Sequence, residues 1–232
     1  ARPNTDFAYC ELHSGAGEYK MEKDMTYGGS SVRAYSELVA AGAAPRLFLN
    51  EINPAVRKDL TKTWKGNGFV SISGDWRSNI GFFIKHYADE DALVLSDPTN
   101  LRDHVPVLDK TAEILSTGAS MMLYLPEGVG AWYTKGGRGK INYNGKMIDQ
   151  SAFVRKTLDV INSSKTANKH AVDMIFPSKT GGAAARLEHL IVVTNKDTRD
   201  KVRQAFKAKG EQLLGEDPDG NLHLTLSSCV AI

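Results

Sequence analysis

Short apolar runs alternate with amphipathic stretches along most of this chain, and this rhythm constrains its fold more than any other feature. The alternation is typical of a parallel sheet whose strands are joined by helices. We expect strands at 7–12, 46–50, 69–73, 92–96, 120–125, 170–175 and 187–194, and helices at 31–41, 54–64, 80–87, 107–115, 151–162 and 197–209. The sequence therefore predicts an α/β fold with a mostly parallel seven-stranded sheet and helices on both faces.

Local sequence signals and the length of the chain indicate where elements begin and how many domains to expect. Asn53 before Pro54 is a helix start, because asparagine caps a first turn and proline suits its first position. Asp-Pro-Asp-Gly at 217–220 predicts a turn between two strands in the tail. The 232 residues suffice for one sizeable core. We expect a single domain over 1–232, with a glycine-rich loop insertion at 127–148 and a strand pair or tail at 210–232.

Composition excludes several classes of protein. The 29 basic and 27 acidic residues give a formal net charge of +2, which is too mild to indicate nucleic acid by itself. Cys10 and Cys229 lack a CxxC spacing, so neither a disulfide framework nor a metal site is expected. The sequence contains no apolar stretch of about 20 residues and does not start with a signal peptide. We therefore expect a soluble, cytoplasmic protein without a membrane or metal partner.

A turn with two glycines follows the first apolar run. Glu11 ends the run, and His13, Ser14, Gly15 and Gly17 come directly after it. Glycine lets the backbone pass close to a ligand, which a side chain at either glycine would obstruct. The pattern favours a loop that binds a nucleotide-type ligand, although a Gly-x-Gly by itself is more often a plain tight turn.

Acidic residues follow the next three strands of the predicted sheet. Glu51 follows the second, Asp75 with Trp76 follows the third, and Asp97 follows the fourth. In an open parallel sheet, ligands bind outside the carboxyl ends of the strands. A carboxylate there can accept hydrogen bonds from ribose hydroxyls or an amino group. The alternative for each residue alone is a carboxylate that caps a helix or lies in a solvated loop.

Several segments, taken in order, resemble class I S-adenosylmethionine-dependent methyltransferases, and most closely the bacterial large-subunit ribosomal RNA adenine-N6 methyltransferases of the J type. These segments are His13-Ser14-Gly15-Ala16-Gly17-Glu18-Tyr19, Arg46 to Pro54, Gly74-Asp75-Trp76, Leu93 to Pro98, Leu123 to Pro126 and His189 to Asn195. The resemblance covers the chain from the first strand to about Asp197. It implies a Rossmann-like class I methyltransferase fold with S-adenosylmethionine as the cofactor.

The resemblance also assigns roles at the cofactor. It places the serine and glycines of the loop along the methionine part, Glu51 at the ribose, and Asp75 with Trp76 around the adenine. The full set of cofactor-binding residues expected on this basis is Glu11, His13, Ser14, Gly15, Gly17, Glu51, Ile52, Asp75, Trp76 and Asp97.

One motif departs from the family. Amino-methyltransferases of this kind carry Asp-Pro-Pro-Tyr or a close variant, in which an aromatic ring stacks on the flipped base. Here the motif is Asp97-Pro98-Thr99-Asn100, so the acidic acceptor is kept while the second proline and the aromatic ring are replaced. A ring from Trp132, Tyr133 or Tyr143 is a conceivable substitute. The family has a segment before the first strand, which is either lost here or lies outside this sequence. The expected catalytic residues are Asp97, Pro98, Asn100 and His13.

The stretch 127–146 interleaves cations with aromatic rings among glycines. Cations meet phosphates while rings stack on bases, so this composition suits a single-stranded nucleic acid. The residues expected to bind it are Trp132, Tyr133, Lys135, Arg138, Lys140 and Lys146. The alternative is a solvated hairpin with a tight turn at Asn144-Gly145.

Three functions remain open on the sequence. The first is an S-adenosylmethionine-dependent methyltransferase that acts on a nucleic-acid adenine amino group, with RNA favoured over DNA. The second is an enzyme of the same fold that acts on a small molecule or a protein side chain. The third is a catalytically inactive relative that works as a binding subunit for a protein partner. Replacement of the base-gripping pair by Thr99 and Asn100 favours the last two.

Overall fold

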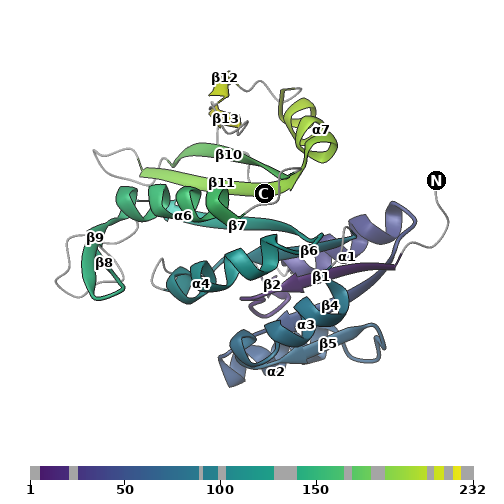
Figure 1. Ribbon diagram of the computed structural model, residues 1–232. Coiled ribbons are helices and arrows are strands. Elements are labelled where there is room, and N and C mark those ends of the chain that lie inside the picture. Colours follow the sequence, from purple (N-terminus) through teal and green to yellow (C-terminus); the bar gives the residue numbers. More distant parts are fainter. Residues whose placement is uncertain are drawn as a thin grey trace. The chain divides into compact units, whose positions relative to one another are not determined.

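The computed structural model describes residues 6–20, 26–88, 91–98, 103–127, 140–164, 169–178, 186–207, 212–216 and 222–225 (Figure 1). Contacts within the chain divide it into two compact units. The N-terminal unit comprises residues 1–97 and 117–119, and the C-terminal unit comprises residues 98–116 and 120–232. The expectation of a single domain over the whole chain stays a prediction.

Four parallel strands form the sheet of the N-terminal unit. They are β1 (Asp6–Glu11), β4 (Ala44–Asn50), β5 (Val70–Ser73) and β6 (Ala92–Ser96), in the spatial order β6-β1-β4-β5. The chain moves from β1 outward through β4 to β5 and then returns to the other side of β1. This reversal is the switch point at which parallel sheets open a crevice for ligands. A separate antiparallel pair, β2 (Glu18–Lys20) with β3 (Thr26–Gly28), lies between β1 and the first helix in the chain.

The helices of this unit follow its strands, and one of them begins at a start signal that the sequence provides. They are α1 (Ser30–Ala40), α2 (Pro54–Thr63), the short 3-10 helix η2 (Trp76–Ser78) and α3 (Ile80–Tyr87). The side chain of Asn53 accepts hydrogen bonds from the backbone N–H groups of Ala55 at 3.0 Å and Val56 at 3.4 Å, and Pro54 opens α2. The predicted start of this helix is thereby confirmed.

Both faces of the sheet in the N-terminal unit are covered. Leu47 and Leu49 of β4 point to one face, and their exposed fractions are 0% and 1%. Phe48 points to the other face, because side chains alternate along a strand. Its ring contacts two rings of α3, with ring centroids 5.2 Å from Phe83 and 4.6 Å from Tyr87. Helix α3 therefore packs on the face that carries Phe48.

The C-terminal unit contains a mixed sheet with helices. Its strands are β7 (Ser120–Glu127), β10 (Lys169–Ser178), β11 (Arg186–Asn195), β12 (Gln212–Glu216) and β13 (Leu222–Thr225), in the order β12-β13-β10-β11-β7. Strand β11 runs antiparallel to β7 and to β10, while β10 and β13 are parallel. The helices are α4 (His104–Leu115), α6 (Gln150–Ser164) and α7 (Lys196–Lys207). The antiparallel pair β12 and β13 matches the two strands expected in the tail.

A β-hairpin occupies the described end of the stretch expected to be an irregular loop. Strands β8 (Lys140–Tyr143) and β9 (Lys146–Asp149) pair through a turn in which Asn144 and Gly145 have φ of 50° and 78°. Positive φ at both central residues defines the turn type that suits a two-residue hairpin. The Tyr143 ring packs edge-on against Phe153 of α6 at 6.1 Å, so it belongs to the packing of this hairpin.

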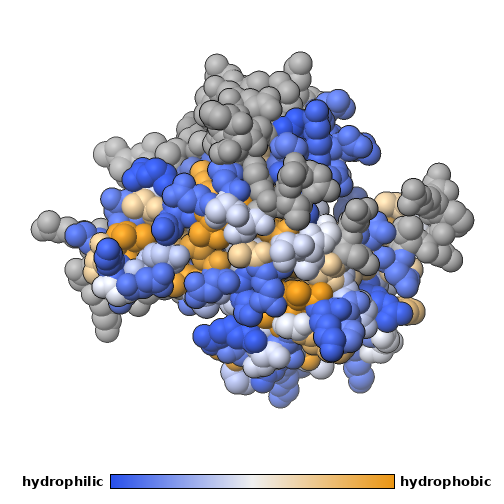
Figure 2. Space-filling view, viewed as in Figure 1, coloured by the Kyte–Doolittle hydropathy of each residue, from blue (hydrophilic) through white to orange (hydrophobic). Residues whose placement is uncertain are grey.

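The strands and helices expected from periodicity are all present among the described residues, with bounds that differ by a few residues. Figure 2 shows hydrophilic side chains over much of the visible described surface, with smaller hydrophobic areas among them. Within the part of the chain that the structure describes, no helix combines the length and the apolar character that a membrane crossing requires.

Replacement of Phe83 by alanine should lower the free energy of unfolding by about 3 to 5 kcal/mol, because it empties a fully buried position between α3 and β4. Phe82 on the same helix is 56% exposed and provides the matched control. Phe82→Ala should change the free energy by less than about 1 kcal/mol. Urea unfolding of both variants measures the difference, and equal losses would contradict the described packing of α3.

Candidate functional site

The carboxyl ends of β1, β4, β5 and β6 meet at one edge of the sheet in the N-terminal unit. The residues that follow these strands are 12–17, 51–53, 74–76 and 97. Parallel pairing of β1 with both β4 and β6 puts the glycine loop at the switch point. The site residues at these strand ends belong to this unit.

The glycine loop needs glycine for two physical reasons. Gly15 and Gly17 have φ of 60° and 78°, a conformation that other residues rarely adopt. A side chain at Gly17 would also meet Leu60 Cδ1 of α2 at 3.0 Å. The N–H of Gly29 donates to the carbonyl oxygen of Gly17 at 2.6 Å and ties the loop to the start of α1. The loop is thus held between α1 and α2.

Ser14 and Asn50 join the ends of β1 and β4. The N–H of Ser14 donates to the carbonyl oxygen of Asn50 at 2.9 Å, and the N–H of Asn50 donates to Oγ of Ser14 at 3.0 Å. The Asn50 side chain donates from Nδ2 to the carbonyl oxygen of Glu11 at 2.9 Å. Ser14 is 2% exposed, so its hydroxyl serves this junction.

Glu51 links the second strand end to the glycine loop. Its Oε2 accepts from the N–H of Gly15 at 3.1 Å, and its Oε1 accepts from the N–H of Asn53 at 2.7 Å. Nη1 of Arg57 donates to the Glu51 carbonyl oxygen at 3.0 Å. Each carboxylate oxygen has a further lone pair for a ligand hydroxyl. The neighbouring Ile52 is 63% exposed and presents an apolar side chain beside it.

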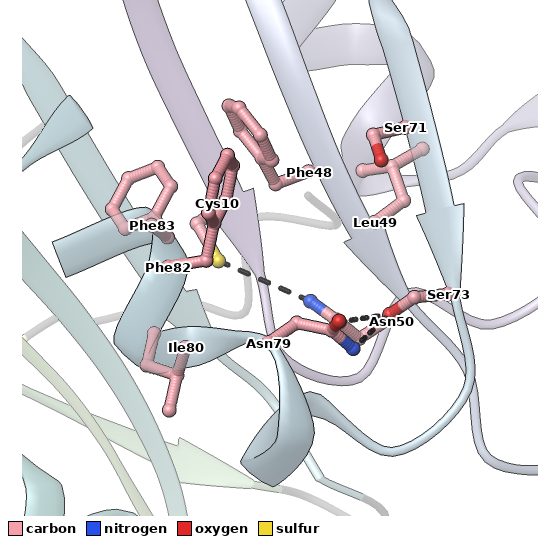
Figure 3. A pocket seen from close by; sticks show the side chains of 10 residues that line it. All are labelled: Cys10, Phe48, Leu49, Asn50, Ser71, Ser73, Asn79, Ile80, Phe82 and Phe83. Atoms are coloured by element: carbon pink, nitrogen blue, oxygen red, sulfur yellow. Dashed lines mark hydrogen bonds between the residues drawn. The ribbon is translucent and has the colours of Figure 1, made fainter. Parts of the chain in front are cut away.

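A chain of polar side chains runs beneath this edge and lines a small cavity of about 70 Å³ (Figure 3). Ser73 Oγ donates to Asn50 Oδ1 at 2.6 Å, and Asn79 Nδ2 donates to Ser73 Oγ at 2.6 Å. Asn50 Nδ2 also faces the Cys10 sulfur at 3.9 Å. Burial raises the pKa of the Cys10 thiol well above its usual range, and the charge of Glu11 adds to this. Cys10 therefore stays a neutral thiol.

Glu11 is a buried carboxyl group next to the loop. Its exposed fraction is 1%, and Ser30 at the start of α1 donates a short hydrogen bond to its Oε1. Among the described residues, its Oε2 is also buried and has no hydrogen-bond partner. Burial raises the pKa of Glu11 to about 8, and the negative charge of Asp97 adds to this, while hydrogen bonds from Ser30 and Tyr9 lower it. An unpaired buried polar atom is costly, so this oxygen is a candidate partner for a ligand.

His13 lies against Trp76, with ring centroids 6.4 Å apart in an edge-on arrangement. Burial lowers the pKa of His13 to about 4, although the charge of Asp75 acts in the opposite direction. The imidazole is therefore neutral near pH 7. Its Nδ1 is buried without a hydrogen-bond partner in the described part of the chain. Trp76 itself is 6% exposed.

Asp75 caps a helix, which is the role that the sequence left open as an alternative to ligand binding for the acidic residues at the strand ends. Its side chain accepts from the N–H of Arg77 at 3.0 Å and caps η2. It also forms an ion pair with the Arg77 guanidinium at 2.6 Å, and these hydrogen bonds hold the pKa of Asp75 below its usual range. The carboxylate is 31% exposed and stays ionised at the site.

The remaining residues predicted from the sequence lie at the end of β6, in the C-terminal unit or outside the described residues. Asp97 is exposed at the end of β6, and Pro98 is buried in the C-terminal unit. Lys140 and Lys146 are exposed at the two ends of the β8–β9 hairpin. Thr99 and Asn100, with four residues expected to bind nucleic acid, lie outside the described residues; these four are Trp132, Tyr133, Lys135 and Arg138. Their roles stay predictions.

Sequence reasoning missed residues that the fold brings to the glycine loop. Ser30 and Gly29 arrive from the start of α1, and Tyr19 arrives from β2. The Gly28-Gly29-Ser30-Ser31 sequence was the available signal, because small residues before a helix permit close approach. The described residues contain no group of three or more His, Cys, Asp or Glu side chains arranged to hold a metal ion.

The pKa of Glu11 makes stability depend on pH. Folding raises it from an ordinary 4.5 to about 8, so between these values the unfolded chain binds fewer protons than the folded protein. The stabilising contribution is complete below pH 4.5 and is lost as pH rises through about 8. As pH rises across this window, the free energy of unfolding of the wild type, taken relative to that of Glu11→Gln, should therefore fall by about 1 kcal/mol per pH unit.

Urea unfolding at pH 5, 6.5 and 8 measures this effect. The lowered pKa of His13 makes stability rise from pH 4 to 6.5, and it acts equally in both proteins. Glu18→Gln, which neutralises an exposed carboxylate in the same unit, is the matched control and should parallel the wild type. Parallel curves for Glu11→Gln would contradict a neutral Glu11.

Comparisons with known proteins bear on the fold. No family model and no curated protein matches the chain. A Legionella pneumophila protein of family-model DUF519 is similar in structure, with a TM-score of 0.62, 13% identity and coverage of 89% of this chain and 82% of that chain. The DszA carbon methyltransferase gives a TM-score of 0.50 at 11% identity, over 84% of this chain and 48% of that chain. Fibrillarin of Aeropyrum pernix with bound S-adenosyl-L-methionine gives 0.44 at 11% identity, over 80% and 66%. The chain has the Rossmann-like fold of class I methyltransferases.

Proposed function

We propose that this protein is an S-adenosylmethionine-dependent methyltransferase. The observation that carries the proposal is the pairing of a glycine loop at the switch point with the buried carboxyl group of Glu11, whose Oε2 lacks a partner among the described residues. This arrangement fits a ligand that has a cationic group next to a nucleoside. The expected match to the J-type family remains part of the proposal.

The residues at the strand ends fit the parts of this cofactor. Glu11 would accept from the ammonium group of the methionine part, and the backbone of Gly15 to Gly17 would lie along it. Glu51 has acceptor capacity left for ribose hydroxyls after its two backbone hydrogen bonds. Trp76 and the exposed Ile52 flank the position of the base, with the carboxylate of Asp75 beside them.

Binding of a cation beside Glu11 has an electrostatic consequence. The carboxyl group is neutral in the free protein near pH 7, because its pKa is about 8. An ammonium group at hydrogen-bond distance favours the ionised form of a carboxyl group. Glu11 therefore changes from a neutral acid to a carboxylate when the cofactor binds, and its buried negative charge gains a partner.

The cofactor, when bound, supplies a methyl group on a sulfonium, which is already a good leaving group. This methyl group would pass to the acceptor nitrogen, with its bond to sulfur broken, and the nitrogen would release its proton to solvent. Asp97 would accept a hydrogen bond from the acceptor amine and align its lone pair with the methyl group. His13 is neutral near pH 7 and contributes no positive charge beside the sulfonium.

The acceptor that we propose is an adenine amino group of a nucleic acid, with RNA favoured. A retained acidic acceptor at Asp97 followed by Pro98 supports it. A small molecule or a protein side chain is the second candidate, supported by Thr99 and Asn100 where the family has a proline and an aromatic ring. An inactive binding subunit is the third, supported by the same substitutions. We place the protein in the cytoplasm as part of this proposal.

Calorimetric titration with S-adenosylmethionine and its demethylated product tests the cofactor. Glu51→Ala should weaken binding by about 10 to 100-fold, because acceptors for ribose hydroxyls are lost. Asp59→Ala removes an exposed carboxylate of α2 away from the strand ends and should leave affinity unchanged. Circular dichroism establishes that each variant is folded. Absence of heat for the folded wild type would overturn the proposal.

Transfer of a labelled methyl group to RNA, DNA and small amines tests the reaction. Asp97→Ala should keep measurable cofactor binding and lower turnover by about 100-fold or more, because the acceptor loses its alignment. Asp91 precedes the same strand and is exposed at the opposite end of β6, so Asp91→Ala is the matched control. Cofactor binding with no transfer to any acceptor would favour the inactive binding subunit.

A further inference from the structure

The β2–β3 hairpin presents two tyrosines on one face. Tyr19 of β2 lies directly opposite Tyr27 of β3 in the antiparallel register. Side chains of directly opposed residues project to the same face, and neighbours along a strand project to the other. Glu18 is therefore on the opposite face from the two rings.

Both rings are unusually open to solvent, and a cation accompanies them. Tyr19 is 51% exposed and Tyr27 is 48% exposed. The guanidinium carbon of Arg33, from α1, lies 5.5 Å from the centroid of the Tyr27 ring. Its Nε donates to the carbonyl oxygen of Gly28 at 3.1 Å, which fixes the guanidinium group beside the hairpin. We call Tyr19, Tyr27 and Arg33 the hairpin surface.

Tyr19 connects the hairpin surface to the candidate site. Its hydroxyl lies against Gly15, and a backbone hydrogen bond from Ala16 holds it there. Its Cε2 lies 3.0 Å from the position that a side chain at Gly29 would take. Burial of the hydroxyl and the negative charges of Glu11, Asp97 and Glu51 raise the pKa of Tyr19. The phenol is thus anchored at the edge of the site, while much of its ring faces solvent.

We propose that the hairpin surface binds a single-stranded nucleic acid next to the site, with bases stacked on the tyrosine rings and a phosphate at Arg33. Every base has a face that stacks on an aromatic ring, and a guanidinium group pairs with phosphate oxygens. The surface would also supply the aromatic contact that Asp97-Pro98-Thr99-Asn100 lacks. This inference rests on the proposed function, because it identifies the surface through which the acceptor reaches Asp97.

The chemistry of the surface favours nucleic acid over a protein segment. The Tyr19 ring is anchored at its hydroxyl end, and both tyrosines are about half exposed, so they offer aromatic surface on which bases can stack. The guanidinium group stacks near one ring and keeps donors for an anion. Negative charges near the hairpin surface do not oppose a phosphate at Arg33. The carboxylates next to Tyr19 belong to the candidate site, where an amine is expected, and Glu18 is on the other face of the hairpin.

Fluorescence anisotropy with labelled adenine-containing 12-nucleotide RNA, the same DNA sequence and a duplex tests the surface. Tyr27→Ala should weaken single-strand binding by about 5 to 100-fold, while Tyr27→Phe should keep most of it. Arg33→Gln should weaken binding. It should also reduce the slope of log affinity against log salt concentration by about 1, the value for one phosphate contact. Phe82→Ala, which removes an equally exposed ring on α3, is the matched control and should leave binding unchanged.

Titration of the same variants with S-adenosylmethionine separates this inference from the proposed function. Tyr27 lies on β3, paired with Tyr19, and is not among the proposed cofactor residues, so Tyr27→Ala should bind the cofactor as the wild type does. A wild type that binds the cofactor but no single strand overturns the hairpin surface and leaves the proposed function standing. Equal loss in Tyr27→Ala and Phe82→Ala, or tighter binding of the duplex, also overturns it. A third outcome overturns the proposed methyltransferase function and leaves the hairpin surface standing. In it, the wild type binds RNA but not the cofactor, and only Tyr27→Ala and Arg33→Gln lose RNA binding.

Discussion

Reciprocal hydrogen bonds between Ser14 and Asn50 are the interaction on which the rest of the candidate site depends. They tie Ser14, which follows β1, to Asn50, the last residue of β4. The glycine loop consequently leaves β1 along a fixed path, and the N–H of Gly15 reaches the carboxylate of Glu51. A ligand at this edge would therefore meet a backbone that is already ordered, which lowers the entropy lost on binding.

Periodicity predicted the main strands and helices because each of them buries an apolar face or stripe. In β4, Leu47 and Leu49 point to one face of the sheet and Phe48 to the other. Asn53-Pro54 marks the start of α2. The two short hairpins were harder to foresee, since three- and four-residue strands carry too little pattern to distinguish them from loops. The Asn144-Gly145 turn was a usable signal and was given only as an alternative. The division of contacts into two units has no marker in the composition.

Candidate site residues were foreseeable where the signal is local. A positive φ at Gly15 and Gly17 follows from a tight turn after a strand, and Glu51 follows from its position after β4. The small residues before α1 permitted a close approach, but Glu11 as the partner of Ser30 could not be predicted, because 19 residues separate the two and only the fold brings them together. The neutral state of Glu11 likewise depends on how much protein surrounds it, which no motif encodes. Asp75 shows that one carboxylate can cap a helix turn and still face a site.

Burial of Cys10 near the end of β1 gives the protein an internal reporter of local opening. Reagents that modify cysteine attack the thiolate, and this thiol is 1% exposed with a raised pKa. It becomes reactive only when β1 separates from α3 or from its neighbouring strands. The rate at which the Cys10 sulfur is modified therefore reports how readily the protein opens locally beneath the glycine loop, whereas equilibrium unfolding reports on the whole molecule.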